Sequence, residues 1–291
     1  MPAGKRTAGL KLRLSGLPAG RLQKEGAGGR CACWKSKSAW SLMSLSGGKP
    51  SVVFKKNELR PRMNEYWCIP PKENADFTAH MENILDVYEM PYNPQIPAVC
   101  MDEKPYQILD NRLEPLPMRC GDIQKTDSEY IRKGTCSIFI FAEPLTGWRY
   151  ASVQEWRTAE DRALEIKHLL TECYPCHEKI ILVMDSLNTH ALASLYKCFP
   201  APEARSYAKR LEIHYTPKHG GWLNIAEIEL NAMTRQCLAR RFMDLETVRK
   251  EVSAWENMRN EDACKATWHF TADDARNKLA SLYPKFSSAG E

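Results

Sequence analysis

No long hydrophobic run occurs in this chain of 291 residues, and no stretch approaches the ~18 apolar residues of a membrane-spanning helix. The N-terminus also lacks the short apolar segment of a secretory signal peptide. Eleven cysteines are present, but their irregular spacing over so long a chain is not typical of a disulfide scaffold. These absences predict a cytoplasmic protein with reduced thiols and no membrane partner.

Acidic residues are scarce at the start of the chain. Residues 1–60 contain 13 Lys and Arg but only Glu25 and Glu58, a net charge of +11, whereas the remainder has 28 basic and 34 acidic residues, a net charge of −6. A basic end on a slightly acidic body is typical of a chain that contacts a polyanion. A solvated basic tail without a partner is the alternative, and charge alone favours neither.

Sustained periodicity is missing from residues 1–50, which hold nine of the fifteen glycines and many serines. We therefore predict an irregular, disordered or remnant basic segment there. Residues 51–72 have the composition of the end of a small basic module and a proline-marked linker. Residues 73–90 are predicted to be a helix, because apolar residues recur at helical spacing.

The remainder, residues 96–285, alternates between apolar runs and amphipathic stretches and is predicted to be one domain. We expect strands at 96–101, 137–144, 148–154, 179–185 and 210–216, with a hairpin between the second and third. Helices are expected at 158–172 with Thr158 as N-cap, and at 189–198, 222–241, 245–258 and 268–283. This order predicts an α/β fold with a mixed sheet flanked by helices.

Two aspartates, Asp102 and Asp185, each follow a predicted buried strand, and ligands collect at the carboxyl ends of such strands. Two carboxylates held close together repel unless a cation lies between them, and Mg²⁺ prefers such oxygen ligands. A third acid on the helix at 222–230 would complete a two-metal site, and Glu227 and Glu229 are both candidates. A turn-forming aspartate and a solvated glutamate are the ordinary alternatives, and periodicity alone does not decide between them.

Five segments carry a family resemblance: VCMDEKP (99–105), YIRKGTCSIFIFAEPLTG (130–147), ILVMDSLNTH (181–190), IHYTPKHGGWLNIAEIEL (213–230) and WHFTADDAR (268–276). Together they resemble the DDE transposases of bacterial insertion sequences related to mariner elements, from about residue 52 to Tyr283. The resemblance implies a ribonuclease-H-like fold and a site for Mg²⁺ or Mn²⁺, with two ions expected. It assigns the three acids to Asp102, Asp185 and Glu227, with Glu229 as the second choice.

The resemblance also implies a reaction: hydrolysis of a phosphodiester at an element end, followed by attack of the freed 3′-hydroxyl on target DNA. Double-stranded DNA and further copies of the chain would be its partners, in a bacterial, nucleoid-associated setting. The residues beside the motifs expected to bind phosphates are Lys104, Arg132, Lys133, Lys218 and His219. Trp222 and Asn224 are expected to fix the glutamate helix. Asn188 and His190 are expected behind the metal ligands, although Asn188 could instead cap a helix.

The sequence departs from the family in two places. Ser186 follows Asp185 where the family usually has Asn, and only FKKNELRP (54–61) resembles the end of a helix-turn-helix module. Residues 1–50 are glycine-rich and aperiodic, as in a chain that is truncated or translated out of frame. The alternatives to a transposase are therefore an inactive remnant that binds DNA or oligomerises, and a host nuclease of the same fold, which the HGGWLNIAE run disfavours.

A second motif, Cys173-x-x-Cys176-His177, matches the pattern of haem attachment and also half of a zinc site. The sequence offers neither an axial partner nor a second pair of zinc ligands near it. We therefore expect no cofactor at this motif.

Overall fold

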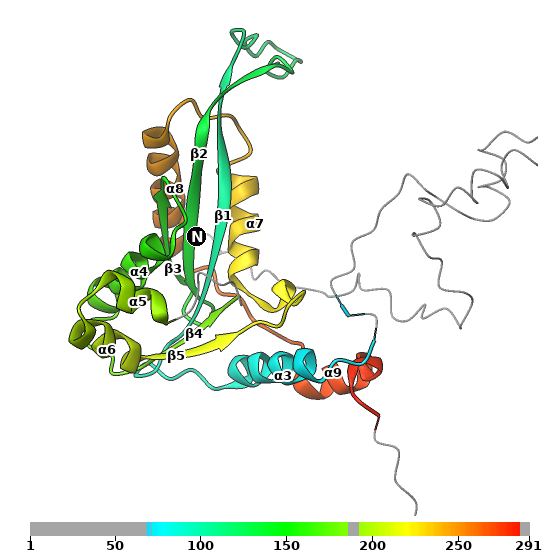
Figure 1. Ribbon diagram of the computed structural model, residues 1–291. Coiled ribbons are helices and arrows are strands. Elements are labelled where there is room, and N and C mark those ends of the chain that lie inside the picture. The colour runs from blue at the N-terminus through cyan, green and yellow to red at the C-terminus, as the bar shows by residue number, and fades with distance from the viewer. Residues whose placement is uncertain (1–68, 71, 186–191, 286–291) are drawn as a thin grey trace, which may run out of the picture. The chain divides into compact units, whose positions relative to one another are not determined.

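The computed structural model describes residues 69–70, 72–185 and 192–285. They contain one five-stranded sheet in the order β3-β2-β1-β4-β5 (Figure 1). The two hairpins β1–β2 and β2–β3 are antiparallel, whereas β4 runs parallel to both β1 and β5. The strands are β1 (Ala98–Asn111), β2 (Tyr130–Glu143), β3 (Trp148–Gln154), β4 (Ile180–Met184) and β5 (Leu211–Tyr215). The predicted mixed sheet is confirmed.

Helices cover both faces of this sheet, as expected for an α/β fold. One face packs against α3 (Ala75–Glu89), α7 (Ala226–Gln236), α8 (Leu245–Glu261) and α9 (Ala272–Lys278). The other packs against α4 (Ala159–His168), the π-helix η2 (Leu169–Cys173), α5 (Ala193–Cys198) and α6 (Ala201–Arg210). Two short 3₁₀ turns, η4 (Gly221–Leu223) and η5 (Ala280–Leu282), complete the helical elements described.

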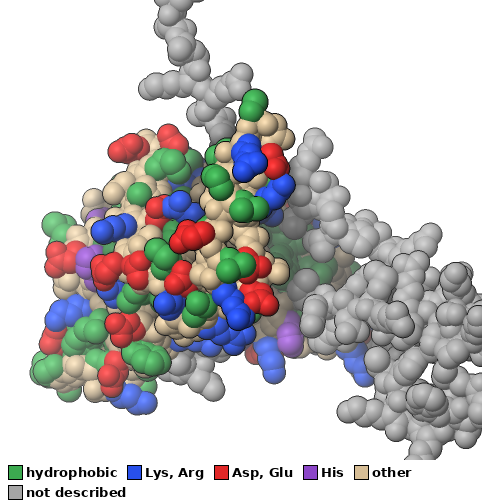
Figure 2. All heavy atoms as spheres, turned by 90° about the horizontal axis from the view of Figure 1, so that it is seen from above, with side chains coloured by type: hydrophobic (Ala, Val, Ile, Leu, Met, Phe, Trp, Pro, Cys, Tyr) green, Lys and Arg blue, Asp and Glu red, His purple; other side chains and the backbone are tan. Residues whose placement is uncertain are grey.

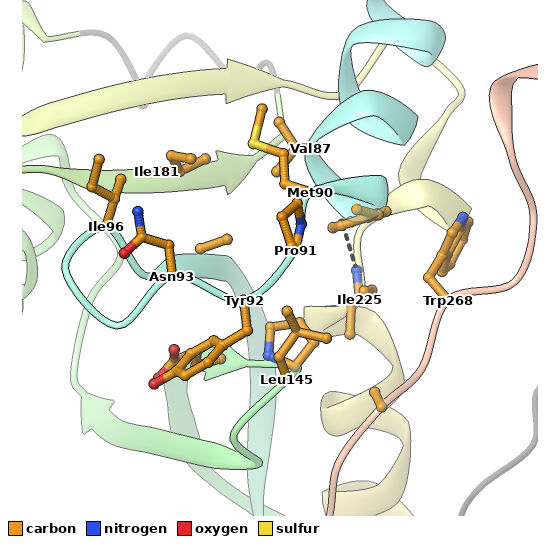
Figure 3. A pocket seen from close by; sticks show the side chains of 15 residues that line it. Val87, Met90, Pro91, Tyr92, Asn93, Ile96, Leu145, Ile181, Ile225 and Trp268 are labelled. Carbon is orange, nitrogen blue, oxygen red and sulfur yellow. Dashed lines mark hydrogen bonds between the residues drawn. The ribbon is translucent and has the colours of Figure 1, made fainter.

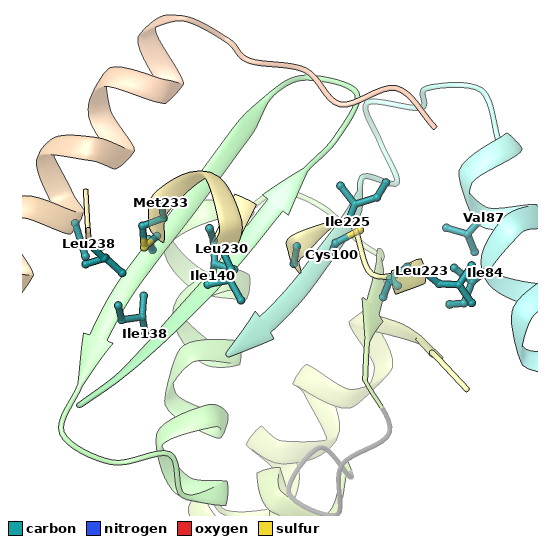
Figure 4. Close-up of a cluster of buried hydrophobic side chains, with 14 of the residues drawn as sticks. Ile84, Val87, Cys100, Ile138, Ile140, Leu223, Ile225, Leu230, Met233 and Leu238 are labelled. Carbon is teal, nitrogen blue, oxygen red and sulfur yellow. The ribbon is translucent and has the colours of Figure 1, made fainter. Parts of the chain in front are cut away.

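Alternation along the central strands divides the core into these two layers. On β1 and β2, Cys100, Ile138 and Ile140 face the layer of α3 and α7, while Met101 and Phe139 face the layer of α4. All five side chains are at most 1% exposed. Figure 4 shows the first layer, where Leu230 and Met233 of α7 lie over Ile138 and Ile140 of β2. The central strands are therefore buried on both sides, which holds α7 firmly on the sheet.

Side-chain caps fix where several helices begin. Thr158 and Asp161 form a capping box at α4, and Thr271 and Asp274 form another at α9. Asp244 caps α8 by accepting a hydrogen bond from the backbone N–H of Thr247. The prediction of Thr158 as an N-cap is confirmed.

Strand β1 is much longer than predicted, and this changes the position of Asp102. The expected strand was 96–101, but β1 continues to Asn111 because β2 pairs with it from Cys100↔Ala142 to Asn111↔Tyr130. Asp102 is therefore inside a strand and not after its end, so that prediction was wrong. Residues 102–111 contain charged and polar side chains, and only the antiparallel partner makes them a strand.

Two helical segments also differ from expectation. The helix predicted at 222–241 is shorter, because Gly221–Leu223 form a separate 3₁₀ turn and α7 ends at Gln236. Helix α6 was not predicted at all. It begins after Pro200 and buries only a narrow stripe, Ala204, Tyr207 and Ala208. Its few apolar side chains share one face, but the segment is short and mostly polar and has Pro200 and Pro202 at its start, which is also typical of a loop.

Beyond the last pair of β1 and β2, residues 112–129 form what we call the hairpin arm. Figure 1 shows β1 and β2 extending past the helices toward it. Its side chains Leu113, Leu116, Met118 and Ile123 are 63–79% exposed. The arm therefore adds little to the buried core.

Helices long and apolar enough to cross a membrane are absent from the part of the chain that the structure describes. The basic segment at 1–50, the FKKNELRP motif, Asn188 and His190 lie outside the described residues.

Candidate active site

The parallel register of the two central strands brings Asp102 and Asp185 together. The last pair between β1 and β4 is Cys100↔Val183, and each aspartate lies two residues further along its own strand direction. Since side chains two residues apart share a face, both aspartates are on the face of Cys100 and Val183. That face is the one covered by α7, which carries Glu227.

The electrostatics of Asp102 show that three carboxyl groups share this place. The pKa of Asp102 is raised to about 7, chiefly by burial and then by the negative charges of Asp185 and Glu227, while the backbone N–H of Glu103 acts to lower it. That N–H donates to Asp102 Oδ1 at 2.7 Å. Burial and the charge of Asp185 likewise raise the pKa of Glu227. The site is therefore a partly dry cluster of acids whose charges repel one another.

Asn224 fixes the start of α7 next to Asp102. Its buried side-chain Nδ2 donates to the backbone carbonyl of Met101 at 2.8 Å, and its Oδ1 accepts from the backbone N–H of Ala226 at 3.1 Å. One side chain thus ties the first turn of α7 to the residue before Asp102. Tyr88 of α3 adds a hydrogen bond to the carbonyl of Leu223 at 2.8 Å.

Gly221 leaves the space that the carboxylate of Glu227 occupies. A Cβ atom built on Gly221 would clash with Glu227 Oε1. The glycine is therefore needed here for close approach of a side chain and not for its backbone conformation.

Glu229, the second candidate for the third acid, points away from the aspartates. It is 3% exposed and forms ion pairs with Arg149 of β3 and Arg259 of α8. Two residues along a helix are separated by a rotation of about 200°, so Glu227 and Glu229 lie on nearly opposite sides of α7. Among the two, Glu227 is the acid that the fold brings to Asp102 and Asp185.

Lys104 is the predicted phosphate ligand that lies nearest the acids along the strand. It follows Asp102 by two residues on the same face of β1, and its Nζ donates to Thr234 Oγ1 of α7 at 2.6 Å. Lys218 and His219 lie in the turn before η4, where Lys218 is exposed and His219 has a φ of 69°. Trp222, half-buried, packs edge-on against Phe270 with ring centroids 6.0 Å apart.

Arg132 and Lys133 are not brought to the acids. Arg132 pairs with Leu109, seven residues beyond Asp102 on β1, a distance of ~23 Å along the strand. Its guanidinium lies over the ring of Tyr130, while Lys133 Nζ lies 3.3 Å from Asp110. These two residues belong to the base of the hairpin arm.

Three buried charged residues near the site were missed by the sequence analysis: Arg149, Arg162 and Glu103. The sequence does contain a pattern that indicates burial of Arg149 and Arg162. Arg149 is in phase with the buried Ala151 and Val153 on β3, and Arg162 precedes Ile166 by four positions on the buried side of α4. A charged residue at a position that the periodicity reserves for apolar side chains indicates a buried ionic or hydrogen-bonding role.

A separate apolar cavity of about 260 Å³ lies near the opposite ends of the parallel strands. Ala98 and Ile181, near the starts of β1 and β4, line it, and Figure 3 shows Met90, Tyr92 and Trp268 around it. It does not contain the three acids.

The Cys173-x-x-Cys176-His177 motif carries free thiols. Burial raises the pKa of Cys173 to about 11, and the ring of His177 packs edge-on against Tyr174. Within residues 69–70, 72–185 and 192–285, no group of three or more His, Cys, Asp or Glu side chains is close enough to hold a single metal ion.

Comparison with known families decides where this fold belongs. The model of the DDE superfamily endonucleases matches residues 97–249, which is more than half of the chain. The chain belongs to the DDE superfamily of endonucleases. The match begins before Asp102 and includes Asp185 and Glu227, so all three acids lie within the DDE region.

Similarity to solved structures identifies the fold of this DDE protein. A Mos1 transposase paired-end complex with a left transposon end has a TM-score of 0.50 at 13% identity, covering 90% of this chain and 83% of that chain. A Mos1 strand transfer complex has a TM-score of 0.49 at 12% identity, covering 91% and 82%. The first likeness confirms the ribonuclease-H-like fold. No curated protein sequence matches the chain.

Proposed function

We propose that this DDE protein is the transposase of a bacterial insertion sequence, cleaving DNA at the element end and transferring the freed 3′-hydroxyl to target DNA. The observation that carries the proposal is the proximity of three carboxyl groups, from inside β1, from the end of β4 and from α7, which is seen in the effect of Asp185 and Glu227 on the pKa of Asp102. Membership of the DDE superfamily of endonucleases supports DNA cleavage as the reaction of these three carboxyl groups.

The residues present suit Mg²⁺ or Mn²⁺. All three side chains offer carboxylate oxygen, which both ions accept, and a cation would relieve the repulsion that raises the pKa of Asp102. Among the described residues, no three such side chains are close enough to hold one ion together, so the three acids would hold two ions between them. When bound, such ions lower the pKa of the attacking hydroxyl and stabilise the leaving oxygen. Crystal structures of Mos1 paired-end complexes are described with Mn and with Mg.

The chain's own residues have divided tasks in this proposal. Asp102, Asp185 and Glu227 hold the ions, and Asn224 keeps the helix of Glu227 against β1. Lys104, whose ammonium group is oriented by Thr234, contacts a DNA phosphate beside the acids. Lys218 and His219, both exposed in the turn that leads to α7, are the further residues that would contact DNA phosphates.

The partners that we propose are double-stranded DNA and further copies of this chain. The Mos1 structure is a paired-end complex with transposon-end DNA, and we extend that mode of assembly to this protein. In the proposed organisation, residues 96–285 form the catalytic domain, 51–95 the end of a DNA-binding module with its linker and helix, and 1–50 a basic segment. The chain would act in the bacterial cytoplasm, on nucleoid DNA.

Nicking of supercoiled plasmid tests the proposed chemistry. We expect the full chain to nick plasmid in Mn²⁺ or Mg²⁺ but not in EDTA, and Asp185→Asn to lower the rate at least ~100-fold. Glu165→Gln is the matched control, because Glu165 is a buried glutamate, 3% exposed, that accepts hydrogen bonds from Ser152 and Gln154 in the layer away from the acids. Equal nicking by the unchanged chain and Asp185→Asn would reject the proposal.

The inactive remnant predicts a different outcome of the same experiment. It would bind plasmid without nicking it in any metal, and Asp185→Asn would bind equally well. Gel shift of the same samples separates this result from a protein that does not bind DNA.

A further inference from the structure

A buried ionic cluster lies on the side of α7 that faces away from Glu227. Glu229 is 3% exposed and Arg149 is 2% exposed. Arg149 Nε lies 3.0 Å from Glu229 Oε2, and Arg259 Nη2 lies 2.9 Å from Oε1 and 3.0 Å from Oε2. We call Glu229, Arg149 and Arg259 the anchor cluster. One carboxylate thus holds two guanidinium groups from two other elements.

The anchor cluster joins three parts of the fold. Arg149 of β3 donates through Nη1 to the carbonyl of Arg259 and through Nη2 to the carbonyl of Cys264, both at 2.7 Å. Its backbone N–H and carbonyl also bond to the side chain of Asn260, at 2.8 and 2.7 Å. The end of α8 is therefore fixed to β3, and Glu229 fixes α7 to both.

A contribution to the stability of the fold does not by itself explain the anchor cluster. Buried ion pairs lose most of their attraction to desolvation, and apolar side chains of similar size often do as well. Their strict geometry, in contrast, selects one arrangement of the elements that carry them. A rotation of α7 that displaced Glu229 would displace Glu227 by a similar amount in the opposite direction, because the two lie about 200° apart.

A second attachment lies at the start of the same helix. Asn224 binds the carbonyl of Met101 beside Asp102, whereas Glu229 binds β3 and α8 on the other side. Asn224 fixes where α7 starts, and Glu229 fixes its rotation. The space for Glu227 is also narrow, since its carboxylate fills the position of a side chain at Gly221.

We propose that Glu229, Arg149 and Arg259 are positioning residues that set the rotation of α7 and so place the Glu227 carboxylate against Asp102 and Asp185 for metal binding. This inference rests on the proposed function, since it concerns the same metal site. It assigns a role to Glu229 that needs no contact with metal or DNA.

Calorimetric titration of the full chain with Mn²⁺ tests this role. Glu229→Gln keeps the shape of the side chain and removes its charge, and we expect Mn²⁺ affinity to fall about tenfold, the usual size of such effects behind metal ligands. Glu165→Gln removes a charge that is equally buried but belongs to the α4 layer, and its affinity should stay within about twofold of the unchanged chain. Circular dichroism establishes that both variants are folded at the titration temperature.

A second variant keeps the test valid if Glu229→Gln does not fold. Arg259→Lys retains the positive charge of a side chain that is 14% exposed, but it loses the guanidinium whose Nη2 contacts both oxygens of Glu229 and puts a more strongly hydrated ammonium in its place. We expect a smaller loss of Mn²⁺ affinity, about threefold, together with faster amide hydrogen exchange in residues 226–236.

The outcomes separate this inference from the proposed function. Unaltered Mn²⁺ affinity in folded Glu229→Gln or Arg259→Lys would overturn the positioning role and leave the proposed function intact. An equal loss of affinity in Glu165→Gln would also overturn it, because the effect would then be one of stability. Binding of Mn²⁺ by the unchanged chain that Asp185→Asn does not weaken would overturn the proposed function, and the positioning role with it.

Discussion

Asp102 is the residue whose acid–base behaviour the fold alters most clearly within the site. Its pKa of about 7 has burial as the first cause and the charges of Asp185 and Glu227 as further causes. A carboxyl with so high a pKa is partly protonated near neutral pH unless a cation is present. The metal-free site should therefore destabilise the fold at neutral and higher pH.

Unfolding at two pH values tests this consequence. Because the pKa in the folded state exceeds the ordinary value of 3.8, the folded protein binds more protons, and the free energy of unfolding falls as pH rises from about 4 to about 7. Asp102→Asn should reduce this fall, leaving the part that comes from the raised pKa of Glu227, and raise the free energy of unfolding at pH 8 by on the order of 2–4 kcal/mol. Urea titrations at pH 5 and pH 8 in EDTA measure it. An equal pH dependence in both proteins would contradict the assignment.

A substitution at Gly221 should alter the site without destabilising the fold. In Gly221→Ala the new methyl group meets only the end of the Glu227 side chain, which can move, so stability should change by less than about 1 kcal/mol. Mn²⁺ affinity should fall at least about tenfold, because the carboxylate is displaced.

Gly121→Ala is the contrasting control for that change. Its φ of +79° disfavours a side chain while nothing lies within 4 Å, so it should cost about 1 kcal/mol of stability and leave Mn²⁺ affinity unchanged. Thermal unfolding and Mn²⁺ titration of both variants give the comparison. Mn²⁺ affinity that is unchanged in Gly221→Ala would argue against Glu227 as a ligand.

At the scale of elements, the hydrogen bonds of Asn224 connect α7 to β1. Asn224 is 1% exposed, so Asn224→Ala would leave the carbonyl of Met101 and the N–H of Ala226 without this partner in a buried place. We expect the free energy of unfolding to fall by about 1–3 kcal/mol. Mn²⁺ affinity should fall as well, and urea unfolding with Mn²⁺ titration measures both. A loss of stability without any loss of affinity would show that Asn224 does not position Glu227.

Across the whole molecule, the hairpin arm and the core have different roles. The four large apolar side chains of the arm are 63–79% exposed, whereas those of the central strands are almost fully buried. Replacing residues 113–128 by an Asn-Gly turn should keep the melting temperature within about 3 °C, because little buried area is lost. Calorimetry of the shortened chain tests this. A fall of 10 °C or more would show that the arm belongs to the folding core.

Charge is also distributed differently over the molecule than along the sequence. Basic and acidic side chains are intermixed over the face shown in Figure 2. The excess of positive charge belongs to residues 1–60. In the proposed function, attraction of DNA to the described part of the chain would therefore depend on a few residues near the acids, such as Lys104.

The sequence by itself determined the class of fold and most of its elements. Apolar runs predicted β4 and the hairpin of β2 and β3, and a hydroxyl residue followed by early acids predicted the start of α4. These signals are local, since periodicity and capping depend on neighbours along the chain. The motifs also proposed Asp102, Asp185 and Glu227 as the three acids, but they did not predict how these side chains are arranged.

Only the tertiary structure decided how the acids meet and what surrounds them. The length of β1 depends on pairing with β2, so Asp102 could not be placed inside a strand from its own neighbours. Glu227 and Glu229 are both acids in the first turn of α7, and their different surroundings come from β1 on one side and from Arg149 and Arg259 on the other. Register and burial arise from contacts between residues distant in sequence, which a local pattern does not contain.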